Sequence, residues 1–209
     1  MLFTNYEHAC FAIDMDDQRL VVDPGGYTTD FTATDSIVAV VLTHAHPDHK
    51  DMRHLRAIRD ANPDVAIIGH TDVISDLEGF ALRPVVANEG IKIGPFELEF
   101  FGGDHAVIHP SIDVIANLGV MINGAVYYPG DSFALPERPV RLLALPVAAP
   151  WLKLSEAVEF IRAVRPQQAV PTHDAVLSET GKSLPDRLVP LLTSDLDITY
   201  NRPDSPIEL

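Results

Sequence analysis

The chain has 209 residues, is 46% hydrophobic and carries a formal net charge of −15 at pH 7, with 15 basic against 30 acidic residues. This balance disfavours a nucleic-acid partner, whose phosphates require basic side chains, and the length suits a single domain spanning residues 1–209. No apolar run is long enough to span a bilayer, no signal peptide is recognised, and the lone Cys10 excludes an internal disulfide, so we expect a cytoplasmic protein without membrane attachment.

The first half of the chain alternates strands with helices. A polar turn at Asp16-Asp17-Gln18 separates two apolar runs, which predicts a hairpin. The nearly continuous apolar run at 37–43 is typical of a strand buried on both faces. The predicted elements are strands at 10–14, 19–23 and 37–43, a helix at 50–61, a strand at 65–68 and a short helix capped by Thr71.

The second half opens with short strands and glycine turns between residues 84 and 101. A hairpin is predicted to turn at Asn123-Gly124. The remaining predicted elements are strands at 113–122, 124–128, 141–147 and 167–173, a helix at 156–165 capped by Ser155, and a helix near 186–192. Two β-rich halves with helices predict an α+β fold, in which two sheets pack face to face and helices cover both outer faces.

The stretch VLTHAHPDHKDM places four ligand-type side chains directly after the buried strand at 37–43. Side chains two positions apart in an extended chain point the same way, so His44 and His46 can share one ion. Pro47 keeps His46 out of the helical region, and the turn that follows directs Asp48 and His49 to a neighbouring point. A polar loop with Asp48 as a helix cap is the alternative, but four such residues in six positions favour metal binding.

One short cluster cannot complete two coordination shells, so we expect further ligands at other strand ends. Four residues follow an apolar run in the same way: Asp23, His105, Asp131 and His173.

The pattern H-x-H-x-D-H, with an upstream Asp and downstream His, Asp and His, resembles the metallo-β-lactamase superfamily over about residues 6–175. The segments GDHAVIHP, PVAAPWLKLSEA and VPTHDA further resemble small bacterial hydrolases of this superfamily, near the ascorbate-phosphate lactonases. The fold that the resemblance implies is a metallo-β-lactamase-like αβ/βα four-layer sandwich, with two packed mixed sheets, helices outside and the site at one edge between the sheets.

The resemblance also implies a role for each motif residue. His44, His46 and His105 bind a first divalent metal ion, and Asp48, His49 and His173 bind a second. Asp131 bridges the two ions, and Asp23 lies behind them and orients the loop. Asp48 and Asp131 are the expected catalytic carboxylates. Zinc is the expected metal because the site is rich in histidine, with manganese and iron as alternatives.

Four other residues are candidates for a substrate pocket, namely His8, His109, Trp151 and Lys153. His8 belongs to EHACF, which resembles a GHxxF element near the site in this branch, although a histidine that caps a strand is an equal alternative. A structural role for His109 and a solvated position for Lys153 at the start of a helix are the corresponding alternatives.

The predicted function is hydrolysis of an ester, lactone, amide or phosphodiester of a small molecule by a hydroxide bound to two metal ions. An iron-dependent redox enzyme of the same superfamily is one alternative, and a non-catalytic metal-binding protein is another, which the full ligand set disfavours. The best-known β-lactamase subclass has Cys where this chain has Asp131, and the nuclease branch carries a large inserted domain. No pattern in the sequence indicates the oligomeric state.

Overall fold

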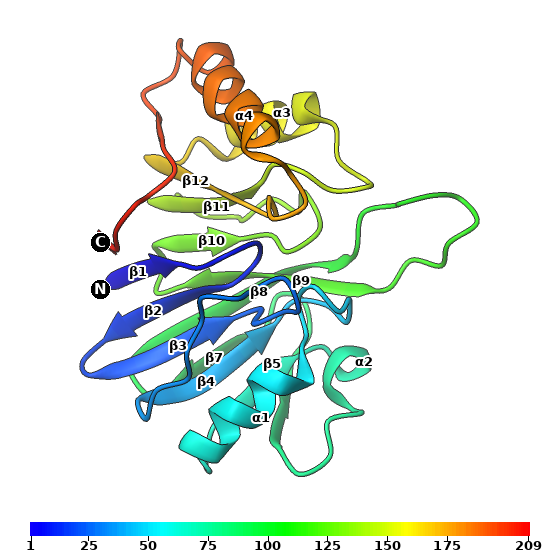
Figure 1. The fold of residues 1–209 in the computed structure, drawn as a ribbon, viewed down its shortest axis with the longest axis vertical. Helices are drawn as coiled ribbons and strands as arrows, with labels where there is room; N and C mark the ends of the chain where they lie inside the picture. Colours follow the sequence, from blue (N-terminus) through cyan, green and yellow to red (C-terminus); the bar gives the residue numbers. More distant parts are fainter.

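The computed structural model describes residues 1–209 as two seven-stranded sheets that pack face to face, with helices on both outer faces (Figure 1). Helices α1 and α2 lie outside the sheet that contains β2 to β5, and α3 and α4 lie outside the sheet that contains β10 to β12. The predicted α+β four-layer sandwich is therefore confirmed.

The first sheet has the order β14-β1-β2-β3-β4-β5-β6. Its strands from β14 to β3 pair antiparallel, and those from β3 to β6 pair parallel. The β2–β3 hairpin turns at Asp16 and Asp17, both of which adopt positive φ. The strands span β1 Leu2–Asn5, β2 Phe11–Met15, β3 Gln18–Val22, β4 Ile37–Leu42, β5 Ala66–Gly69, β6 Ala81–Pro84 and β14 Ile207–Glu208.

The second sheet has the order β13-β12-β11-β10-β9-β8-β7 and repeats the same scheme. Its strands from β7 to β10 are antiparallel, and those from β10 to β13 are parallel. The β9–β10 hairpin turns at Asn123 and Gly124, as predicted, with φ of 51° and 59°. The strands span β7 Gly90–Ile93, β8 Phe96–Asp104, β9 Ala116–Ile122, β10 Val126–Tyr128, β11 Leu142–Pro146, β12 Gln168–Thr172 and β13 Thr199–Tyr200.

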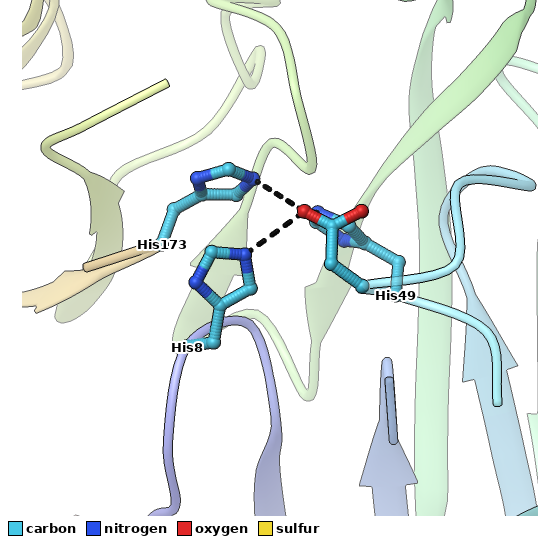
Figure 2. Close-up of side chains that lie close together, drawn as sticks. His8, His49 and His173 are labelled. Atoms are coloured by element: carbon cyan, nitrogen blue, oxygen red, sulfur yellow. Dashed lines mark hydrogen bonds and ion pairs between the residues drawn. The ribbon is translucent and has the colours of Figure 1, made fainter. Parts of the chain in front are cut away.

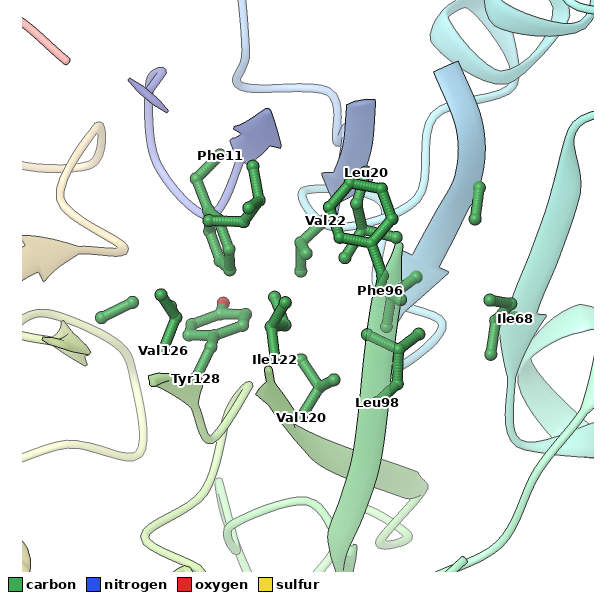
Figure 3. Packing of buried hydrophobic residues seen from close by; sticks show 14 of the residues in the cluster. Phe11, Leu20, Val22, Ile68, Phe96, Leu98, Val120, Ile122, Val126 and Tyr128 are labelled. Carbon is green, nitrogen blue, oxygen red and sulfur yellow. The ribbon is translucent and has the colours of Figure 1, made fainter. Parts of the chain in front are cut away.

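Three apolar clusters hold the layers together. The largest lies between the sheets, where Phe11 of the first sheet meets Tyr128 of the second with ring centroids 5.5 Å apart (Figure 3). Strand β4 contributes to two clusters because successive side chains alternate: Val41 faces the other sheet, whereas Val40 and Leu42 face α1 and α2. Burial on both faces fixes the end of β4, and therefore the position of the histidine loop that follows it.

Four helices cover the outer faces, and all four differ in part from the sequence prediction. They are α1 Met52–Ala61, α2 Thr71–Ile74, α3 Leu154–Val164 and α4 Glu179–Leu192. Helix α1 starts at Met52 instead of residue 50, because Asp51 caps it. His70, not Thr71, caps α2. Helix α3 starts before Ser155 because the Glu156 carboxylate accepts the Lys153 backbone N–H and closes the first turn. Helix α4 begins well before residue 186, since Ser178 caps it and both of its prolines lie inside it.

The two chain ends lie side by side (Figure 1). Strand β14 pairs with β1, and the backbone N–H of Leu209 donates to the carbonyl of Met1. Neither strand was predicted, because β1 has four residues and β14 only two, too few for a periodic pattern to be detected. No helix combines the length and the apolar character that crossing a membrane would require.

Candidate metal centre

The ligand-type residues converge at one edge of the molecule, where strands of both sheets end. Strand β3 leads to Asp23 and β4 to the cluster that starts at His44, both in the first sheet. From the second sheet, β8 leads to His105, β10 to Asp131 and β12 to His173. The structure thus brings all eight predicted metal-site residues together, although they come from five separate stretches of chain.

Potential ligand atoms fall into two main groups, each with its atoms within 4.8 Å of one another. One group consists of His44, His46, His105 and Asp131, and the other of His8, Asp48, His49 and His173. These are the two sets expected from the sequence, with His8 added to the second.

Asp131 contacts histidines of both groups. Its Oδ2 lies 3.4 Å from His105 Nε2 and 3.2 Å from His173 Nε2, and its Oδ1 lies 3.3 Å from His49 Nε2. Bonds of about 2.0 Å to a tetrahedral zinc ion place neighbouring ligand atoms about 3.3 Å apart. The spacing around this carboxylate therefore fits ligands of a shared pair of ions.

Four histidines present the same ring nitrogen to the centre. The Nδ1 atoms of His44, His49, His105 and His173 each lie within hydrogen-bonding distance of an oxygen atom. Their Nε2 atoms are buried and make no hydrogen bond. A buried polar atom without a partner is costly, whereas a metal-binding histidine needs one free nitrogen and a hydrogen bond on the other. The donor set therefore fits divalent metal ions.

Asp23 connects histidines of the two groups, His49 directly and His44 through Thr43. The Asp23 carboxylate accepts hydrogen bonds from the Thr43 backbone N–H at 2.8 Å, from Thr43 Oγ1 at 2.6 Å and from His49 Nδ1 at 2.8 Å. Because the Thr43 hydroxyl hydrogen points to Asp23, its oxygen accepts from His44 Nδ1 at 3.0 Å. Sequence reasoning found Asp23 and missed Thr43, whose only signal was its position between the strand and the first histidine.

The backbone at the centre is closely packed. A Cβ on Gly25 would lie 1.7 Å from the carbonyl oxygen of Asp48 and 2.4 Å from the backbone nitrogen of His49. Glycine is therefore required where the loop after β3 crosses the histidine loop. Asp23 and His173 adopt positive φ values of 43° and 60°, which side-chain-bearing residues seldom do. Such strain is common where side chains are held for a function.

Charges in the centre are coupled. Burial lowers the pKa of His49, but the carboxylates of Asp131 and Asp23 outweigh it and raise that pKa to about 10. Burial likewise lowers the pKa of His173, but the neighbouring carboxylates of Asp131 and Asp48, 3.2 and 3.4 Å from its Nε2, raise it to about 9. Burial raises the pKa of Asp131, yet the charge of His49 holds it well below its usual value. Without metal, histidine protons balance the carboxylates, and incoming cations must displace those protons.

Two of the four candidates for a substrate pocket contact the carboxylates of the centre. Figure 2 shows His8 and His173 directed at the same carboxylate, that of Asp48, and His8 Nε2 donates to its Oδ2 at 3.0 Å. The indole Nε1 of Trp151 donates to Asp131 Oδ2 at 2.8 Å. Both residues thus touch proposed metal ligands; the sequence indicated that they lie near the site but not which side chains they contact.

The structure does not bring the other two candidates into the centre. His109 is exposed in the long loop between β8 and β9, and its Nδ1 lies 2.7 Å from Ser111 Oγ. The Lys153 side chain is 81% exposed and its ammonium pairs with Glu156. The alternative readings, a solvated lysine at a helix start and a histidine with a local structural contact, agree better with these positions.

A family model described as a β-lactamase superfamily domain matches residues 3–173. The chain belongs to the metallo-β-lactamase superfamily. Protein Rv0786c of Mycobacterium tuberculosis is similar to this superfamily member, with 33% identity over 204 residues that cover 95% of this chain and 96% of the relative.

Solved structures share the fold of this superfamily member. Igni18, a metallo hydrolase from Ignicoccus hospitalis, aligns with a TM-score of 0.75 at 17% identity and covers 100% of this chain and 98% of its own. CmlA, a diiron β-hydroxylase from Streptomyces venezuelae, aligns with a TM-score of 0.69 at 16% identity over 100% of this chain and 53% of its own. At such identities the likeness concerns the fold, which therefore supports more than one metal chemistry.

Proposed function

We propose that this superfamily member is a hydrolase that holds two divalent metal ions and cleaves an ester, lactone, amide or phosphodiester of a small molecule. One observation carries the proposal: four buried histidines have Nδ1 anchored and Nε2 free, and they surround a carboxylate that contacts both groups. A degenerate or purely structural pocket would not require this uniform orientation.

In this proposal each ion has its own histidines. One ion takes His44, His46 and His105, the other takes Asp48, His49 and His173, and Asp131 serves both. Imidazole and carboxylate donors suit zinc, which we propose as the metal, with manganese or iron able to replace it.

When bound, the two ions polarise the substrate oxygen and lower the pKa of a bound water toward neutrality. The chain's own residues hold and orient the ions and shape the entrance. His46 and Asp48 are the only two proposed ligands that are not buried, so the substrate reaches the centre from their side. Asp131, whose side chain is 4% exposed, lies behind them. Ions held by these residues would supply the activation of water, so the chain itself would not need to provide a nucleophile.

An iron-dependent redox enzyme is the second candidate. The observation that favours it is the fold shared with CmlA, together with a histidine and carboxylate donor set that also suits iron. Metal analysis and the absorption spectrum of protein purified without chelator separate the two, since a zinc enzyme is colourless and a diiron enzyme absorbs visible light.

The direct test of the hydrolase proposal is reconstitution. Protein stripped with chelator and reloaded with zinc should bind about two ions per chain and hydrolyse generic ester or phosphodiester substrates. Stripped protein should be inactive, and His109→Ala, outside the centre, should behave like the wild type. Fewer than one ion per chain after reloading, in protein that remains folded, would refute the dinuclear proposal, and loaded protein inactive toward every substrate class would refute hydrolysis.

A further inference from the structure

Trp151 is the only tryptophan of the chain, and its indole reaches the centre of the proposed metal site. It lies in the loop between β11 and α3, far in sequence from the histidine cluster. Its Nε1–H donates to Asp131 Oδ2 at 2.8 Å, whereas Asp131 Oδ1 is buried and makes no hydrogen bond. The indole therefore holds one oxygen of the carboxylate and leaves the other free.

Both partners of this hydrogen bond, Trp151 and Asp131, are held by further contacts. The Asp131 backbone N–H donates to Asn117 Oδ1 at 3.0 Å, so the main chain and the carboxylate are anchored separately. The Trp151 ring packs edge-on against Phe133, with centroids 5.2 Å apart, and lies 6.1 Å from the His105 ring. Aromatic neighbours thus pack against the indole ring, while the hydrogen bond to Asp131 sets the direction of its N–H.

The chemistry of an indole suits this position. It is a donor only, and it carries no charge, so it can orient a carboxylate without competing with it for metal. A hydrogen bond to a ligating carboxylate also fixes its rotation and reduces the electron density that it donates. Asp131 is the proposed carboxylate ligand whose oxygens lie within 3.4 Å of histidine nitrogens of both groups, so its rotation affects two sites at once.

We propose that Trp151 is a positioning residue for Asp131 and, through it, for retention of the metal ions; this inference rests on the proposed metal centre. It differs from a substrate contact, which would change KM and leave metal affinity unaltered. It also differs from a packing role, which any aromatic ring of similar size would fill.

The matched variants are Trp151→Phe, which keeps an aromatic ring and removes the N–H, and Phe133→Leu, which disturbs the packing and keeps the N–H. Zinc affinities are measured by chelator competition on metal-free protein. Loss of an outer hydrogen bond to a ligand weakens metal binding about 10-fold to 100-fold. We expect a loss of this size for the weaker-bound ion in Trp151→Phe, and less than about threefold in Phe133→Leu.

The unique indole supplies a second readout that needs no substitution. Zinc titrated into the metal-free wild type should change the tryptophan emission in step with ion loading, and Phe133→Leu should keep this response. Asp131→Ala, which removes the acceptor, should abolish it.

Two results would overturn the inference: wild-type zinc affinities in Trp151→Phe, or tryptophan emission that ignores zinc while the ions bind. Either leaves the hydrolase proposal standing. Failure of the wild type to bind zinc would overturn both. The fluorescence result decides the matter even where Trp151→Phe does not fold.

Discussion

Replacing Asp23 by Asn tests how hydrogen bonds orient the histidines of the proposed metal centre. In the wild type, hydrogen bonds run from His44 Nδ1 to the Thr43 hydroxyl, from that hydroxyl to Asp23 Oδ2, and from His49 Nδ1 to the same oxygen. Asp23 Oδ1 accepts the Thr43 backbone N–H, so in Asp23→Asn the amide oxygen must stay there. The amide NH2 then takes the place of Oδ2 and donates where Oδ2 accepted.

The direction of the whole chain of hydrogen bonds then reverses. Thr43 Oγ1 must accept from the amide and donate to His44 Nδ1, and His49 Nδ1 must also accept. Both rings carry their proton on Nε2, the atom that faces the centre. To bind metal, each ring must move its proton back to Nδ1. Its Nδ1–H then faces another hydrogen-bond donor in a buried site, which costs about 1–3 kcal/mol of binding free energy for each histidine. Since 1.4 kcal/mol is tenfold, each ion should bind about 10-fold to 100-fold more weakly.

Chelator competition with zinc measures this loss, and thermal melting of the metal-free protein separates it from unfolding. Asp14→Asn is the matched control, because Asp14 pairs with Arg19 at the far end of β2 and should leave zinc affinity unchanged. The reasoning is wrong if Asp23→Asn binds both ions as tightly as the control does, or if only one ion is affected.

Three further predictions concern the bridge, the loop and pH. Asp131→Ala should retain about one ion per chain, because a three-histidine set can still hold zinc, and should lose several orders of magnitude in turnover; retention of two ions and normal turnover would contradict the bridging role. Gly25→Ala should lower both the melting temperature and the zinc content, because its Cβ would overlap the Asp48 carbonyl, whereas Gly90→Ala, with no atom closer than 3.8 Å, should do neither. Zinc affinity should rise with pH until the protons with pKa values of about 10 on His49 and about 9 on His173 are removed. Both pKa values exceed the ordinary histidine value of 6.5. The protonated histidines therefore stabilise the metal-free protein fully below pH 6.5, and this stabilisation is lost as pH rises through 9 to 10. Melting scans of the metal-free protein check this sign, and a zinc affinity that does not depend on pH would contradict the raised pKa values.

The sequence predicts which side chains gather at the candidate centre because each of them follows the end of an apolar run. His105, Asp131 and His173 follow strands of one sheet that run in the same direction and therefore end at a common edge. The roles of His8 and Trp151 were not predictable in the same way. His8 contacts Asp48, 40 positions away in the sequence, and Trp151 contacts Asp131, 20 positions away. No local sequence pattern encodes which donor reaches which carboxylate.

Helix boundaries were predicted less well for a related reason. Pro185 and Pro190 suggested a short final helix, but Ser178 supplies a cap that lets α4 begin earlier. The pairing of β14 with β1 joins the two ends of the chain, so its partners are separated by almost the full length of the sequence.

The division of the ligands between the two sheets has a consequence for folding. Neither sheet alone contains a complete set, since Asp131 and His173 belong to one and His49 to the other. Ions bound there as proposed would act as a crosslink between the halves of the molecule, because the complete ligand sets exist only in the folded chain. Thermodynamic linkage then adds RT ln(1 + [L]/Kd) to the unfolding free energy for each site, about 2.7 kcal/mol at a hundredfold excess over Kd. The free zinc concentration around the protein would thus set how often the two halves separate, and with it the protein's lifetime against proteolysis.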